Sequence, residues 1–178
     1  MIHKALKNIF IFCCLFLISC GKPSTDTKII PFELSILDFN SRLPYSVLYT
    51  LSNNEMKIIK KGIQKSKRDS VLFSINNLSL NKTNQVANIK IDSLSVFYAT
   101  RCQKNYDIKS FQFKKNGKSK NIILQNYYQK ELCESILIIN KLIPTKYKIQ
   151  YNKEAIILEM NNCENIEIID DWENKKSS

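Results

Sequence analysis

The side chains of this chain that could do chemistry are mainly carboxylates, because histidine and glycine are scarce. The only histidine is His3, and the chain has three glycines. Ser-His-Asp or Cys-His catalysis, histidine zinc sites and glycine-rich phosphate loops therefore lack the residues that they need. A glycan hydrolase that uses two acids stays open. The sequence singles out no pair among the candidate acids Glu33, Asp38, Asp92, Asp107 and Glu134.

The first twenty residues are typical of a secretory signal peptide. Lys4 and Lys7 precede an apolar run from Ile9 to Ile18, and a small residue follows. The alternative is a retained membrane anchor, but a spanning helix needs about twenty apolar residues. Gly21 and the polar residues after it end the run too early for that.

The end of this run, Leu17-Ile18-Ser19-Cys20, resembles the lipobox of bacterial lipoproteins, with Cys20 at +1. The resemblance implies that the Cys20 thiol receives a diacylglycerol and that cleavage then removes residues 1–19. It also implies that a further acyl chain usually follows on the amine of Cys20. Gly21 at +2 is not the Asp associated with inner-membrane retention, so we expect a cell-envelope protein on an outer membrane.

The domain boundaries follow from this interpretation. Residues 1–19 are the signal peptide, residues 20–27 a lipidated flexible tether, and residues 28–178 a single globular domain with an acidic C-terminal tail. That domain is long enough to bury a core. The tail acids lack the spacing of a calcium loop, so we expect a solvated tail, no metal and no cofactor. They include Glu164, Glu167, Asp170 and Asp171.

The formal charge of +11 favours anionic partners or reflects only a composition rich in Lys, Asn and Ile. Arginine is preferred for phosphate recognition, and only Arg42, Arg68 and Arg101 occur. We therefore expect no nucleic acid as a partner. Four lysines and two tyrosines form the predicted contact patch, although the tyrosines could equally be sheet core. They are Lys114, Lys115, Lys118, Lys120, Tyr127 and Tyr128.

Three cysteines remain in the expected mature chain: Cys102, Cys133 and Cys163. An exported protein meets oxidising conditions, so one disulfide is expected. Three cysteines allow three pairings, and the preferred one is Cys102–Cys133, which would join a loop to a helix. The alternative is three unpaired, buried residues.

A β-hairpin is predicted around Asn116-Gly117, which is the favoured pair for a type I′ turn. A two-residue turn there places Phe111 opposite Ile122 and Lys115 opposite Lys118. Asn53-Asn54 predicts a second hairpin. Apolar alternation predicts further strands within 29–39, 45–52, 71–75 and 147–151.

The main helix is predicted over residues 129–143, where apolar side chains from Leu132 to Ile143 fall on one face before Pro144. Segments 79–92 and 154–160 stay open between helix and strand. The predicted fold is α+β, an antiparallel sheet of β-hairpins with one main helix packed on one face.

Function is predicted mainly by exclusion. We expect a non-enzymatic, lipid-anchored binding module for an envelope or exported protein, of the inhibitor, immunity or complex-subunit type. The alternatives are a carboxylate-dependent hydrolase of envelope glycan and a structural link between membrane and glycan.

Overall fold

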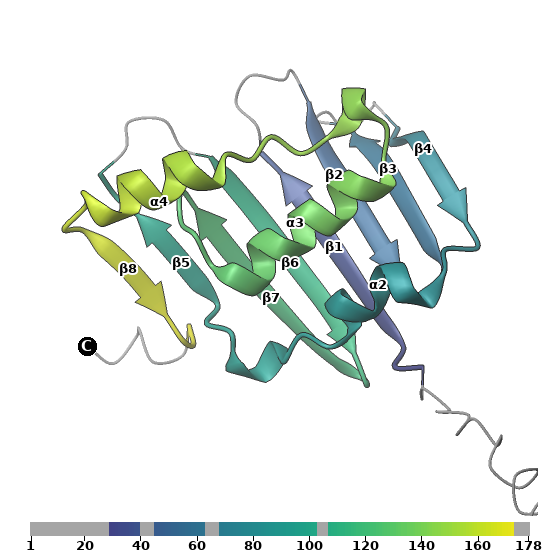
Figure 1. The fold of residues 1–178 in the computed structure, drawn as a ribbon, viewed down its shortest axis with the longest axis horizontal. Coiled ribbons are helices and arrows are strands. Elements are labelled where there is room, and N and C mark those ends of the chain that lie inside the picture. The colour runs from purple at the N-terminus through teal and green to yellow at the C-terminus, as the bar shows by residue number, and fades with distance from the viewer. Residues whose placement is uncertain (1–28, 40–44, 63–67, 103–106, 173–178) are drawn as a thin grey trace, which may run out of the picture.

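The computed structural model describes residues 29–39, 45–62, 68–102 and 107–172, so the lipobox and Cys20 lie outside the described residues. One sheet of eight strands has the order β4-β3-β2-β1-β6-β7-β5-β8 (Figure 1). The strands are β1 (Phe32–Asp38), β2 (Ser46–Ser52), β3 (Glu55–Lys61), β4 (Ser70–Asn76), β5 (Phe97–Thr100), β6 (Ile108–Lys115), β7 (Lys118–Gln125) and β8 (Ile166–Ile169). The helices are α2 (Leu80–Ala87), α3 (Lys130–Leu142) and α4 (Lys153–Asn161), with 3-10 turns η1 (Ile91–Ser93) and η2 (Thr145–Tyr147).

Both predicted hairpins are confirmed. Asn116 and Gly117 have φ of 51° and 75°, the positive values that a type I′ turn requires. The register places Phe111 opposite Ile122 as predicted. The turn at Asn53-Asn54 joins β2 to β3.

The main helix is confirmed as α3, and its apolar face lies in the core. The Gln129 side chain accepts a hydrogen bond from the Leu132 backbone N–H at 2.8 Å, which caps the helix start. Leu132, Ile136 and Ile139 are fully buried. They share one core cluster with strand residues that include Leu34, Ile36, Phe111 and Ile122.

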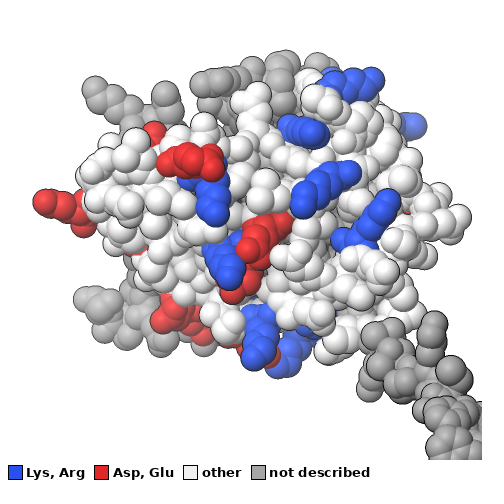
Figure 2. Space-filling view, viewed as in Figure 1, with Lys and Arg blue, Asp and Glu red and all other residues white. Residues whose placement is uncertain are grey.

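Segments 79–92 and 154–160 both contain helices, α2 and α4 respectively. The described residues therefore hold three α-helices where the sequence predicted one main helix. Figure 1 shows all three in front of the sheet, so the face behind carries no described helix. On the helix-covered face, basic groups gather toward β3 and β4 and acidic groups toward α4 and β8 (Figure 2). None of the described helices has the length and apolar character needed to cross a membrane.

The C-terminal tail is only partly the solvated segment that was expected, because it contains β8. The sheet is mixed: β5 pairs in parallel with β7 and antiparallel with β8. Arg101 forms an ion pair with Glu167 at 2.6 Å, and the Ser95 hydroxyl donates to Asp170 at 2.5 Å. Two of the tail acids are therefore used to fasten this edge strand.

The strand predicted at 147–151 is wrong. This segment holds the end of η2 and an extended stretch that pairs with no strand of the described sheet. The Asn140 side chain on α3 accepts from the Ile149 N–H at 2.8 Å and donates to the Ile149 carbonyl at 2.9 Å. One amide thus supplies the hydrogen bonds that a neighbouring strand would give.

Candidate binding surface

The sheet face opposite the helices, here called the open face, carries a row of side chains that crosses every strand. The strand register places Leu37 beside Leu48 on one side and beside Ser110 on the other. We call the complete set the cross-sheet row: Val71, Ile59, Leu48, Leu37, Ser110, Ile123, Phe97 and Ile169. Ser110 is its only polar member.

Successive residues of a strand point to opposite faces. Ile36 and Ile122, the strand neighbours of Leu37 and Ile123, lie in the core, so the row faces away from it. Val71 is 61% exposed, and Leu37, Leu48 and Ile123 are half-buried. With strands about 4.8 Å apart, a row across eight strands is about 34 Å long. The row is apolar except at Ser110, and Phe97 within it is only 7% exposed. A largely apolar row on an otherwise polar face is typical of a docking site.

The rest of the open face is polar but nearly neutral. The row next to the cross-sheet row runs through Ser35, Thr50, Gln112 and Asn121. Four basic side chains on or beside this face each pair with an acid: Lys57–Glu55, Lys61–Asp69, Lys114–Glu33 and Arg101–Glu167. Within the described residues, positive charge is therefore not concentrated on this face.

One end of the cross-sheet row carries an aromatic and cationic group of side chains. The Phe97 and Trp172 ring centroids are 5.6 Å apart, and the Arg101 guanidinium lies 5.3 Å from the Phe97 centroid. Trp172 covers Phe97 and is itself 44% exposed. Tryptophan and arginine are enriched among the residues that contribute most to protein–protein binding.

The hairpin lysines do not form the free patch that was predicted. Lys114 lies on the open face and pairs with Glu33. The other three reach the connection between α2 and β5: Lys115 donates to the Ile89 carbonyl at 2.9 Å, Lys118 pairs with Asp92 at 2.8 Å, and Lys120 donates to the Leu94 carbonyl. These contacts link the hairpin to that connection.

The predicted tyrosines lie at the other end of β7 from the hairpin turn. Tyr127 stacks on Tyr98 with centroids 5.4 Å apart, and Lys153 lies 5.3 Å from the Tyr128 ring. An eight-residue strand is about 27 Å long, so the lysines and tyrosines make no common patch. Tyr127 and Tyr128 pack against the core, as the alternative interpretation held.

The predicted disulfide Cys102–Cys133 is wrong: Cys102 pairs with Cys163, with Cα atoms 5.7 Å apart. Cys133 is a free, buried cysteine on the core side of α3. Its burial follows from helical periodicity, since the fully buried Ile136 lies three residues later on the same face. Cys163 reaches Cys102 because β8 pairs with β5, and that pairing could not be read from local patterns.

Two of the candidate acids, Asp38 and Asp107, meet at Lys109. Lys109 Nζ lies 2.5 Å from Asp107 and 3.9 Å from Asp38. Lys109 and Asp38 are both buried, and burial raises the Asp38 pKa to about 6 although Lys109 opposes this. The Lys109 ammonium thus lies between one buried carboxylate and one whose side chain is 45% exposed, so the two acids share a single cation.

The raised pKa predicts a pH dependence. A carboxyl whose pKa is higher in the folded state stabilises the fold fully below its unfolded pKa and loses this contribution as pH rises through about 6. Asp38→Asn removes that loss, so its stability relative to the wild type should rise by about 2 kcal/mol between pH 4 and pH 7.5. Urea unfolding at both pH values measures this.

Asp92→Asn is the matched control for that prediction. Lys118 lowers the Asp92 pKa, so removal of this exposed carboxyl should change stability with pH in the opposite direction. A parallel pH dependence in Asp38→Asn and the wild type would contradict the assignment.

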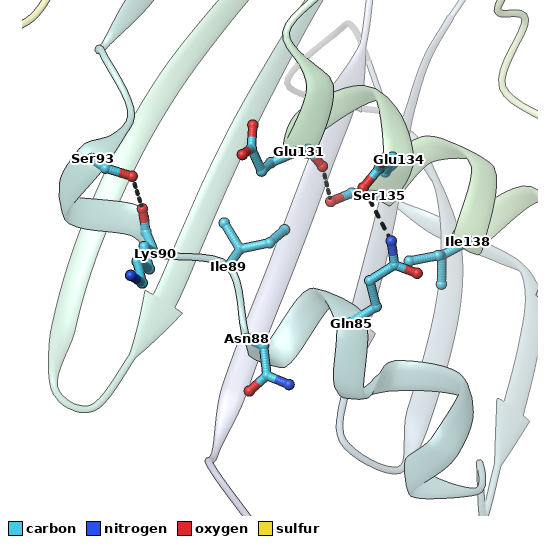
Figure 3. Close-up of a pocket in the computed structure, with 9 residues that line it drawn as sticks. All are labelled: Gln85, Asn88, Ile89, Lys90, Ser93, Glu131, Glu134, Ser135 and Ile138. Carbon is cyan, nitrogen blue, oxygen red and sulfur yellow. Dashed lines mark hydrogen bonds between the residues drawn. The ribbon is translucent and has the colours of Figure 1, made fainter.

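Glu134 lies in a cleft of about 350 Å³ between α3 and the segment after α2 (Figure 3). Glu131 also lines the cleft, one helical turn earlier. The Gln85 amide donates to Glu134 at 3.1 Å, and Glu131 is exposed. Glu33 and Asp92, the other two candidate acids, pair with Lys114 and Lys118.

The described residues contain no group of three or more His, Cys, Asp or Glu side chains arranged to hold a metal ion. Comparisons of the chain with protein-family profiles, curated proteins and solved structures found no match. Function is therefore argued from the surfaces themselves.

Proposed function

We propose that this chain is a lipid-anchored, non-enzymatic binding module of the cell envelope, on the outer membrane, with an envelope or exported protein as its partner. An inhibitor, an immunity protein and a complex subunit all need one persistent docking surface and no catalytic group. The anchor rests on the lipobox resemblance at Leu17-Ile18-Ser19-Cys20.

The cross-sheet row is the observation that carries the proposal. It crosses the sheet over about 34 Å and is apolar except at Ser110, with hydroxyl and amide side chains beside it. The Trp172–Phe97–Arg101 end supplies the residue types that dominate binding energies. The helix-covered face, by contrast, is occupied by the chain's own α2, α3 and α4.

Leu48→Lys should abolish partner binding and leave the fold intact. Leu48 is a half-buried member of the row on a central strand, so a bound partner would have to bury the new ammonium. We expect affinity to fall at least about 30-fold, or about 2 kcal/mol. Affinity capture from envelope and secreted fractions, followed by titration of the enriched protein, gives the measurement.

Leu158→Lys is the control, because Leu158 is 63% exposed on α4, away from the open face. This variant should bind as the wild type does. Equal capture by the wild type and Leu48→Lys would place the partner elsewhere, and no stoichiometric partner with any bait would contradict the proposed function.

The cleft with Glu131 and Glu134 favours one second candidate, hydrolysis of envelope glycan (Figure 3). Paired acids are the only catalytic residues that this sequence offers for it. Release of soluble sugars from purified envelope glycan by the wild type, but not by Glu134→Gln, would favour this second function.

A further inference from the structure

The chain enters the sheet at the end of the strands where both hairpin turns lie. Phe32, the first residue of β1, lies opposite Lys115 beside the β6–β7 turn (Figure 1). Asn53 of the β2–β3 turn fastens this entry: its side chain accepts from the Phe32 N–H at 3.0 Å and donates to the Ile30 carbonyl at 2.9 Å. The expected tether, residues 20–27, can extend no more than about 30 Å. If Cys20 carries lipid, this end of the sheet lies within about 35 Å of the membrane.

A groove of about 420 Å³ lies at this end of the sheet, between the chain entry and the β6–β7 turn, and Pro31 and Phe32 line it together with polar side chains. Three lysines line it: Lys114, Lys115 and Lys118. Asn53 and Ser119 add an amide and a hydroxyl, and Glu33 is the only carboxylate among the lining residues. Ammonium, amide and hydroxyl groups are hydrogen-bond donors of the kind that bind a phosphate oxygen.

The present partners of these lysines compete weakly with such a ligand. Lys114 and Glu33 are 54% and 42% exposed, and Lys118 and Asp92 are 65% and 72% exposed. Ion pairs this exposed contribute little, because solvent screens them. Lys115 donates to the uncharged Ile89 carbonyl, and the Asp92 carboxylate that pairs with Lys118 also attracts the Lys115 charge.

We propose that this groove binds the phosphate of an anionic phospholipid headgroup in the membrane that holds the anchor. The inference rests on the proposed lipid anchor and adds a second, electrostatic contact to it. Lipid-anchored proteins in general bind membranes more stably when basic residues assist the lipid chain. The contact orients the sheet with its hairpin turns toward the membrane and with Cys102–Cys163, at the other end of β5, away from it.

Lysine acylation tests this on the full processed chain. The protein is purified from membranes, reconstituted in phosphatidylglycerol or phosphatidylcholine vesicles, treated with an amine-acylating reagent and digested for mass spectrometry. Lys115 and Lys118 should react about fivefold more slowly in the anionic vesicles. The attraction of each lysine to an anionic membrane surface corresponds to about a fivefold change in binding, and a bound lysine is protected from the reagent. Lys146 and Lys153, on η2 and α4, are internal controls and should not change.

Each arm decides a different point. Equal acylation of the groove lysines in both vesicles overturns the proposal. Full protection of these lysines when inorganic phosphate is added to the phosphatidylcholine vesicles also overturns it, because the groove would then be a free-phosphate site. Lys115→Gln with Lys118→Gln should remove the difference at Lys114. The mass of the intact chain reports separately on lipid at Cys20, so failure of the anchor and failure of the groove are distinguishable.

Discussion

Replacing Cys102 and Cys163 together with serine is expected to lower the free energy of unfolding by about 4 kcal/mol. The bond closes a loop with a sequence separation of 61 residues, and opening it returns that loop's conformational entropy to the unfolded chain. It also joins the loop after β5 to the turn before β8, so the edge strand and Trp172 lose their covalent support. Urea unfolding of wild type and double variant measures the difference.

Reduction supplies the control for the disulfide. Dithiothreitol should lower wild-type stability by the same amount and leave the double serine variant unchanged, because Cys133 is already a buried thiol. A wild-type unfolding curve that is insensitive to dithiothreitol, measured after complete reduction is verified by mass, would contradict the pairing.

Lys109→Met is expected to destabilise the fold by about 3–5 kcal/mol at pH 7.5. Lys109 is 4% exposed and lies between Asp38 and Asp107, so its removal leaves the buried Asp38 carboxylate without a cation. The loss should shrink at pH 4, where Asp38 binds a proton and no longer needs a counter-charge.

A double-variant cycle separates the charge from the packing of that side chain. Asp38→Asn in the Lys109→Met background should recover part of the lost stability at pH 7.5, since it removes the unpaired charge. Lys114→Met, at an exposed pair, is the matched control and should cost under about 1 kcal/mol. A cost for Lys109→Met that is equal at both pH values would point to packing alone.

The local elements were predictable where one residue pattern decides the backbone. Asn116-Gly117 specified a type I′ turn, and the register of β6 with β7 then followed. The spacing from Leu132 to Ile143 specified α3 in the same way. The strand prediction for 147–151 failed because this segment pairs with no strand, and at Ile149 the Asn140 side chain takes the place of a strand neighbour.

The candidate surface was harder to predict, because it depends on which strands are neighbours. Alternation along each strand places four members of the row on the side away from the core, and this alternation is visible in the sequence. They are Leu37, Leu48, Ile123 and Phe97. Only the long-range order, with β1 beside β6 and β5 beside β7, aligns them into one row. The lysine–tyrosine patch failed for a similar reason, since residues near in sequence lie at opposite ends of β7.

The cysteine pairing has a consequence for biogenesis. In the exported chain that we propose, Cys133 emerges before Cys163 and is the first partner available to Cys102. A correct bond therefore skips a cysteine, so either α3 must sequester the Cys133 thiol before oxidation or a wrong bond must be exchanged later. If exchange is the route, production in a host without disulfide isomerase accumulates a mispaired form, and if sequestration is the route, it does not. Cys133→Ala leaves no competing thiol and should mature independently of that enzyme.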